Sequence, residues 1–214
     1  MDPVVAFFLK GNVMDGKEIL SKDEFKRCAD FHGHLCPGLA IGYRAAKAGL
    51  ERLEQGRAPD DELVAIMETD ACGADALQVL TGCTVGKGNL IIKDYGKHVI
   101  TLMGRASGKG LRLSLKPGAL SIDERHQALM GKITNGTATR EEQQEFEELH
   151  LQRTCEVLEK PLEDLFYIAD PKGPLPSRAR IEPSIACGRC GEPTMASKLI
   201  ERNGKRLCRE CMEG

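Results

Sequence analysis

Residues 31–38 read FHGHLCPG, and the rest of the chain is organised around this stretch. Pro37 has no N–H to lose and a fixed φ, so it suits the first turn of a helix, and the apolar spacing that follows predicts one. Cys36 then lies at the helix N-terminus, where free N–H groups and the helix dipole favour a thiolate. His32 and His34 precede it, and imidazole can ligate a metal or move a proton. A buried cysteine that only caps the helix is the alternative.

Composition and charge exclude several classes of protein. The 214 residues carry 30 Lys and Arg against 32 Asp and Glu, so no net field draws the chain to nucleic acid or to a membrane surface. No apolar run approaches the ~18 residues of a membrane span, and residues 1–9 lack the cationic start of a signal peptide. Nine cysteines, an odd number, argue against a closed disulfide framework. We therefore expect a soluble, cytoplasmic protein from a reducing compartment.

The first half of the chain predicts alternating helices and a strand. A capping box at residues 21–24, SKDE, begins a short helix that leads to the FHGHLCPG stretch. The helix after Pro37 should end at about Gln55, before Gly56. Residues 63–67, LVAIM, form a short apolar run between acidic residues and are expected to be a buried strand.

The next elements complete a helix–strand–helix–three-strand order. Thr69 or Asp70 can cap the helix after the first strand, and Gly82 ends it. Capping boxes beginning at Ser121 and Thr139 start two extra helices further on. Three strands are expected between the helix that ends at Gly82 and the first of these extra helices, at residues 89–93, 98–103 and 111–116.

Four cysteines near the C-terminus have the spacing of a zinc site. They form two C-x-x-C pairs with seventeen residues between the pairs. Residues 202–205, RNGK, are a strong type I′ hairpin turn that would return the second pair to the first. Four thiolates leave no open position, so we expect a structural zinc on which folding of the ribbon depends. The ligands are Cys187, Cys190, Cys208 and Cys211.

A proline-rich segment predicts the domain organisation. Residues 170–186 should be a stiff linker between an α+β domain at 1–169 and the zinc ribbon at 187–214. Basic residues in the ribbon could contact nucleic acid or a partner protein. Aromatic residues do not alternate with them, so we do not expect nucleic-acid binding.

A second constellation of possible ligands lies in the larger domain. Cys72 follows the first strand at a helix N-terminus, a position that commonly carries sites in α/β architecture. If the two helix starts converge, His34, Cys36 and Cys72 could bind a metal with one position open, and these three are the candidate catalytic residues. Cys83 lies beyond a helix of ~16 Å, so it joins the site only if its loop folds back or a neighbouring subunit supplies it. Otherwise it is a buried small side chain. The candidate core ligands are His32, His34, Cys36, Asp70, Cys72 and Cys83.

The glycine-rich loop at residues 82–89, GCTVGKGN, invites comparison with a phosphate-binding loop. It is one residue short of the Walker spacing and has Gly88 where Ser or Thr should bind magnesium, so a nucleotide hydrolase is rejected. The glycines and Lys87 could still form an anion-binding nest.

Three motifs together resemble the FmdE family, which takes its name from a component of formylmethanofuran dehydrogenase. They are FHGHLCPG at 31–38, TGCTVGKGNL at 81–90 and DYGK at 94–97, and the C-terminal ribbon resembles the zinc finger often fused to such a domain. The resemblance implies an α+β fold with a mixed sheet, which agrees with the element order read from the residues. The family is linked by name to the tungsten or molybdenum enzyme that captures carbon dioxide as formylmethanofuran. The FmdE component is not the part that holds the molybdopterin, and members with the ribbon need not belong to that complex.

Three functional hypotheses follow. The first is a metal-binding, redox-associated accessory protein with a Cys/His core site, a structural zinc and a redox-enzyme partner. The second is a stand-alone enzyme that uses a thiolate or an open-site metal on a small anionic substrate near Lys87. The third is a partner-binding module whose ribbon docks the partner.

We also expect a homodimer whose interface lies close to His34 and Cys36. A second copy could supply Cys83 to the core site, and twofold pairing would cover the edges of a small sheet. The apolar N-terminal segment at residues 4–9 is a candidate to reach across to the partner.

Overall fold

The computed structural model describes residues 15–120 and 123–214, and the chain divides into two compact units. The first ends at Arg178 and the second begins at Ala179. Segment 4–9 lies outside the described residues. Within the described part of the chain, no helix is long and apolar enough to cross a membrane.

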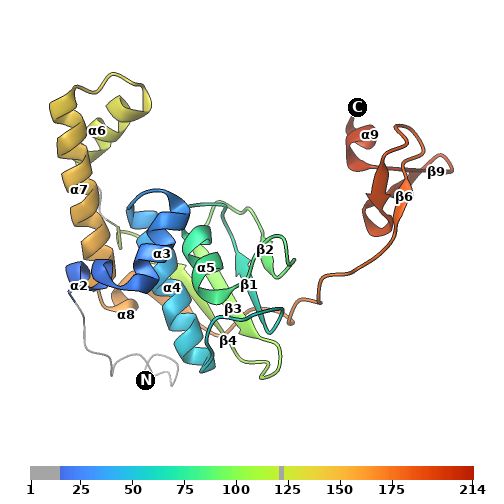
Figure 1. The fold of residues 1–214 in the computed structure, drawn as a ribbon, viewed down its shortest axis with the longest axis horizontal. Helices are drawn as coiled ribbons and strands as arrows, with labels where there is room; N and C mark the ends of the chain where they lie inside the picture. The colour runs from blue at the N-terminus through green and yellow to red at the C-terminus, as the bar shows by residue number, and fades with distance from the viewer. Residues whose placement is uncertain (1–14, 121–122) are drawn as a thin grey trace. The chain divides into compact units, whose positions relative to one another are not determined.

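A five-stranded sheet with the order β2-β1-β3-β4-β5 is the centre of the first unit (Figure 1). The predicted mixed sheet is confirmed, because β1 and β2 are parallel while every other neighbouring pair is antiparallel. The fifth strand was not expected from the sequence. The strands are β1 (Leu63–Met67), β2 (Leu90–Ile92), β3 (Val99–Gly104), β4 (Gly110–Leu115) and β5 (Phe166–Ala169).

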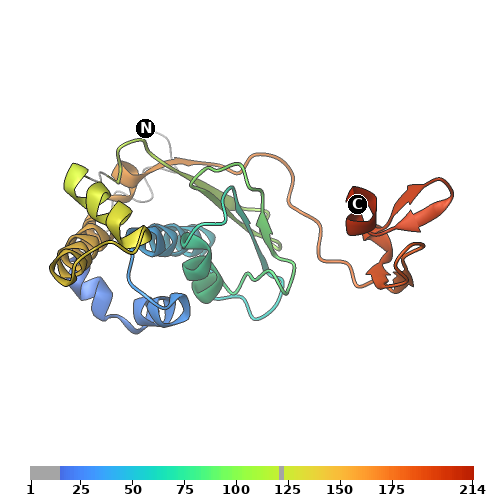
Figure 2. The same cartoon turned by 90° about the horizontal axis from the view of Figure 1, so that it is seen from above.

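Helices cover one face of this sheet (Figure 2). The central one is α4 (Pro37–Leu53), which packs against β3, β4 and a second helix, α5 (Gly73–Thr81). Its buried side chains include Leu39, Ala40, Tyr43 and Ala46, each removed almost completely from water. Burying a side chain of leucine size stabilises the fold by ~1.5–3 kcal/mol, so this face holds α4 on the sheet. The other helices are α2 (Gly16–Ser21), α3 (Asp23–His32), α6 (Glu124–Thr134), α7 (Arg140–Glu159) and α8 (Leu162–Leu165).

Residues 170–178, predicted as the start of a linker, are bound to the sheet of the first unit. The Cβ that an alanine would add at Gly110 would lie 2.4 Å from Pro171 Cγ, so the chain crosses β4 closely there. Arg105 donates to the carbonyl of Pro176 at 2.6 Å and pairs with Asp61 at 3.0 Å. Residues 170–178 therefore contact the start of β4 and, through Arg105 just after β3, are connected to Asp61 before β1.

Several predicted helix caps are wrong, although the helices themselves form. The capping box at 21–24 is absent because Ser21 ends α2, where its hydroxyl donates to Glu18 O at 2.7 Å. Neither Thr69 nor Asp70 caps α5, whose N-cap position is occupied by Cys72 without a side-chain bond. These predictions failed because a residue caps a helix only if it lies at the position where the helix begins. That position depends on where the preceding element ends, which the local motif does not show.

Other predicted helix ends are confirmed or shift slightly. Thr139 forms the predicted capping box with Glu142, and Gly82 ends α5 in the left-handed conformation. Helix α6 is capped by Asp123; Ser121, the predicted cap, lies outside the described residues. Helix α4 ends at Leu53, slightly before the predicted end.

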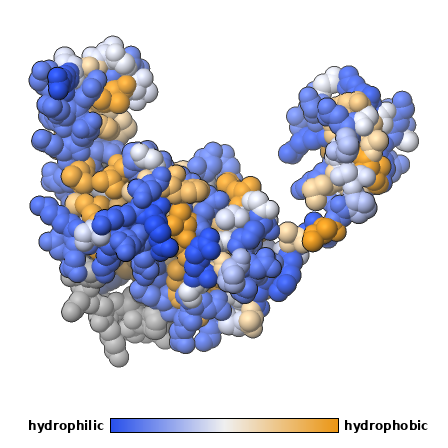
Figure 3. Space-filling view, in the orientation of Figure 1, coloured by the Kyte–Doolittle hydropathy of each residue, from blue (hydrophilic) through white to orange (hydrophobic). Residues whose placement is uncertain are grey.

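The second unit is a small ribbon built from two hairpins. One pairs β6 (Ser184–Ala186) with β7 (Pro193–Met195), and the other pairs β8 (Ile200–Arg202) with β9 (Lys205–Leu207). The predicted type I′ turn is confirmed, since Asn203 and Gly204 have φ of 52° and 74°. A 3₁₀ turn at Ala196–Lys198 and helix α9 (Arg209–Glu213) complete this unit. The face of each unit shown in Figure 3 is mainly hydrophilic with smaller apolar patches.

Candidate metal centres

Three of the predicted core ligands lie together in the first unit. His32 ends α3, Cys36 is the N-cap of α4, and Cys72 precedes α5. One ligand atom from each lies within 4.8 Å of the other two, a grouping that could hold a metal ion. His32 Nε2 and Cys36 Sγ are 3.5 Å apart. The chain thus brings one imidazole and two thiols to a single point.

The local sequence explains why these side chains converge. Gly33 ends α3 with φ of 91°, a left-handed conformation that glycine adopts without strain. The chain then enters α4, where Cys36 Sγ accepts the N–H of Leu39 at 3.3 Å. Gly42 allows α4 and α5 to approach closely, because a Cβ there would lie 2.3 Å from the carbonyl oxygen of Gly73.

Gly38 sets the space beside the two thiols. A Cβ at this position would lie 3.1 Å from Cys72 Cβ, 3.5 Å from Cys72 Sγ and 3.9 Å from Cys36 Sγ. The C-P-G part of the motif therefore leaves room for Cys72 to lie next to Cys36.

Asp75 orients His32, and the sequence analysis missed it. Its carboxylate lies 2.6 Å from His32 Nδ1, so the Nδ1 proton is held there and Nε2 faces the thiols. A carboxylate on the far nitrogen of a ligating histidine is the usual support of a metal site. The signal available from sequence was an aspartate in the first turn of α5, three residues after Cys72.

Burial controls the protonation of Cys36. It raises the pKa of the thiol to about 11, the N–H of Leu39 acts in the opposite direction, and the Cys72 thiol raises it further. The expectation that the helix N-terminus would favour a thiolate is therefore wrong for the metal-free protein. A coordinated cation would reverse this balance, because a thiol bound to a metal is deprotonated.

The remaining predicted core residues lie outside this group of three. His34 is exposed, although its ring centroid is 4.3 Å from that of His32. Asp70 is exposed after β1. Cys83 is fully buried in the hydrophobic core, where its N–H donates to Thr81 Oγ1 at 3.1 Å.

Lys87 lies at the opposite end of β1 from the core cysteines. Its Nζ donates to the carbonyl of Asp60 at 2.9 Å, and Asp60 comes just before β1 begins at Leu63. Cys72, by contrast, follows the end of β1. Five strand residues span ~17 Å, so one small substrate does not contact both Lys87 and Cys72.

The four cysteines of the ribbon also converge. Their Sγ atoms all lie within 4.8 Å of one another, and those of Cys190 and Cys208 are 3.9 Å apart. Backbone N–H groups of Cys208, Cys190 and Arg189 lower the pKa of Cys187 to about 6. Desolvation and the neighbouring thiols raise the pKa of Cys211 to about 12. The four thiols form a group that could hold a metal ion with no coordination position left open.

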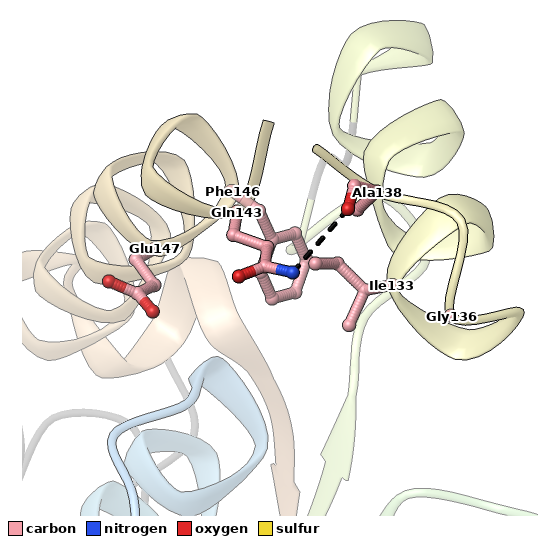
Figure 4. Close-up of a pocket in the computed structure, with 6 residues that line it drawn as sticks. All are labelled: Ile133, Gly136, Ala138, Gln143, Phe146 and Glu147. Atoms are coloured by element: carbon pink, nitrogen blue, oxygen red, sulfur yellow. Dashed lines mark hydrogen bonds between the residues drawn. The ribbon is translucent and has the colours of Figure 1, made fainter. Parts of the chain in front are cut away.

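A cavity of about 310 Å³ lies between α6 and α7, near the turn that joins them (Figure 4). No pattern in the sequence predicted this cavity, and none of the predicted site residues lines it. One wall is the ring of Phe146, and Gln143 donates across it to the carbonyl of Ala138 at 3.4 Å. The lining is Ile133, Gly136, Ala138, Gln143, Phe146 and Glu147.

The fold and the two clusters define a mixed-sheet α+β protein with a cysteine ribbon, and two groups among its described residues could hold a metal. Residues 31–167 match the family model described as "FmdE, Molybdenum formylmethanofuran dehydrogenase operon". This match covers more than half of the chain, and the chain belongs to the FmdE family. The resemblance inferred from the three motifs is thereby confirmed.

Two known proteins are similar to the chain. A "Probable S-adenosyl-L-methionine-binding protein" from Archaeoglobus fulgidus is 32% identical over an alignment of 194 residues, and the match covers 86% of this chain and 51% of the relative. The chain therefore spans about half the length of that relative. A solved structure of a "tungsten formylmethanofuran dehydrogenase subunit e (fmde)-like protein" from Syntrophus aciditrophicus has a TM-score of 0.56 at 23% identity. The match covers 94% of this chain and 95% of that one, and the likeness is one of fold.

Proposed function

We propose that the protein is a metal-binding accessory protein with one transition metal at His32, Cys36 and Cys72 and a structural zinc in the ribbon. The observation that carries this proposal is the pair formed by Asp75 and His32. A carboxylate 2.6 Å from Nδ1 leaves Nε2 as the free ligand atom, and that atom faces two thiols. Family membership and both cysteine clusters support the metal-binding role.

The core ligand set leaves a coordination position open. One imidazole and two thiolates suit zinc and other borderline or soft metals, and three protein ligands plus water are the pattern of catalytic zinc. A bound metal would supply a Lewis acid or an exchangeable position for a partner's ligand. His32, Cys36 and Cys72 would hold it, and Asp75 would orient the His32 imidazole toward it. The redox association and the redox-enzyme partner belong to this proposal and rest on the operon named in the family description.

A metal-free thiolate enzyme receives no support from the site. Burial raises the pKa of Cys36, so its thiol is neutral near pH 7 unless a cation is bound. The homodimer stays a prediction. The three-ligand group is complete within one chain, so the core site gives no reason to borrow Cys83 from a second copy.

Metal content of cysteine variants tests the proposal. Full-length protein, expressed without a tag and washed with a weak chelator, should hold two equivalents by elemental analysis. The double variant Cys36→Ser/Cys72→Ser should hold one, and Cys187→Ser/Cys208→Ser should lose the other. Cys155→Ser is the matched control, because this half-buried cysteine lies outside both clusters. If Cys36→Ser/Cys72→Ser retains the full metal content, the core site does not exist.

A further inference from the structure

Two histidines outside the described clusters face each other between α6 and α7. His126, in the first turn of α6, is fully buried, and its Nε2 lies 3.1 Å from Nδ1 of His150 on α7. His150 is half-buried, so the pair is reached from its side. Neither residue was singled out by the sequence, because their separation of 24 positions matches no ligand motif.

The surrounding contacts fix both rings. Phe146 stacks on His150 with a centroid distance of 4.7 Å and meets His126 edge-on at 5.3 Å. Asp123 caps α6 by accepting the N–H of His126 at 2.8 Å, and its other oxygen pairs with Arg153 of α7 at 2.7 Å. The two helices are thus joined at the level of the histidines, and the ring positions are set before any ligand arrives.

A purely structural role leaves part of this arrangement unexplained. His126 Nδ1 is buried and finds no hydrogen-bond partner in the described part of the chain. An unsatisfied buried polar atom costs ~1–3 kcal/mol, and leucine or phenylalanine would fill the same volume without that cost. Burial also lowers the pKa of both imidazoles, so both are neutral near pH 7 and each ring has one nitrogen lone pair. Without a metal, one of the two facing nitrogens donates its proton to the other; ligation by both requires that proton to move to the far nitrogen of its own ring.

We propose that His126 and His150 form a further metal site, which takes one divalent transition metal of the class that prefers imidazole. With metal–nitrogen bonds of ~2.05 Å, two nitrogens 3.1 Å apart subtend roughly 100° at the ion, between octahedral and tetrahedral geometry. Zinc, nickel and copper all accept such a pair, and water completes the coordination from the His150 side.

The histidine pair and the core ligands belong to the same unit, and α7, which carries His150, packs against α4, whose N-cap is Cys36.

Zinc titration of the full-length, untagged protein tests the proposal. Protein already holding its ribbon and core zinc is titrated with ZnCl₂ by calorimetry, and the wild type should bind one further equivalent. His150→Gln should lose that equivalent and keep the other two. His98→Gln is the matched control, because His98 is exposed just before β3, and this variant should bind zinc like the wild type.

Two further measurements separate this site from the others. Cys36→Ser/Cys72→Ser should lose the core zinc but still bind one zinc at His126 and His150. The histidine site can therefore be tested even if the core site proves not to exist. In wild-type protein labelled with ¹⁵N-histidine, zinc should shift the imidazole nitrogens of His126 and His150. Equal zinc binding by wild type and His150→Gln, with unmoved imidazole signals, would overturn the proposal and leave only a histidine–histidine hydrogen bond.

Discussion

Removing the carboxylate of Asp75 should weaken metal binding at the core site without removing a ligand. The structure places this carboxylate 2.6 Å from His32 Nδ1, where it fixes the tautomer and the ring orientation. Loss of such a supporting group lowers metal affinity by ~10–100-fold, which corresponds to roughly 1.4–2.8 kcal/mol. Asp75→Asn keeps a neutral acceptor and should lie near the lower limit. Asp75→Ala keeps none and should lie near the upper limit.

The assay is competition with a chromophoric zinc chelator, using protein whose ribbon is intact. The ribbon equivalent should be unchanged in both variants, which provides an internal reference. Asp70→Asn is the matched control, because this exposed aspartate follows the same strand but lies outside the ligand group. If Asp75→Ala binds core zinc as tightly as Asp70→Asn, then His32 is not a ligand held by Asp75 and the reasoning fails.

Three more outcomes follow from packing and protonation. Gly38→Ala should weaken core metal binding about tenfold, measured by chelator competition, because the added Cβ would displace Cys72. By contrast, the Cβ added by Gly131→Ala meets open space on α6, and this variant should raise the free energy of unfolding by up to ~1 kcal/mol. Gly42→Ala should lower the free energy of unfolding by ~2–3 kcal/mol in urea titrations, since its Cβ would overlap the backbone of α5. Burial raises the pKa of Cys28 and Cys36 from 9.0 to about 11, so the folded chain holds these two protons more tightly than the unfolded chain. Metal-free protein should therefore be most stable below pH 9 and lose stability as the pH rises toward 11. Urea unfolding at pH 8 and at pH 10.5 measures this difference.

Local patterns in the sequence predicted much of the fold. Pro37 began its helix, β1 fell at the predicted residues, and the Asn-Gly pair formed its turn, because each depends on residues within a few positions. The strand β5 was missed because its short apolar run gains a partner only by pairing with β4, about fifty residues earlier. Residues 170–178 were predicted as part of a stiff linker for the same reason, since Pro171 contacts Gly110 only in the folded chain.

The candidate site was less predictable than the fold. The ligand types and the two helix starts could be read from Cys36 and Cys72, but which residues converge depends on the packing of α3, α4 and α5. Asp75 reaches His32 only through that packing. The direction of the Cys36 pKa shift was predicted wrongly, because the helix N-terminus is visible in the sequence whereas the burial that outweighs it is not.

The central claim is that one metal lies between His32, Cys36 and Cys72. A crystal of the zinc-grown protein, with diffraction recorded on both sides of the zinc absorption edge, tests it most directly. The account predicts an anomalous peak within bonding distance of His32 Nε2 and both Sγ atoms, with a fourth, non-protein ligand completing the tetrahedron. A peak confined to the ribbon cysteines, with the core thiols metal-free, would contradict it.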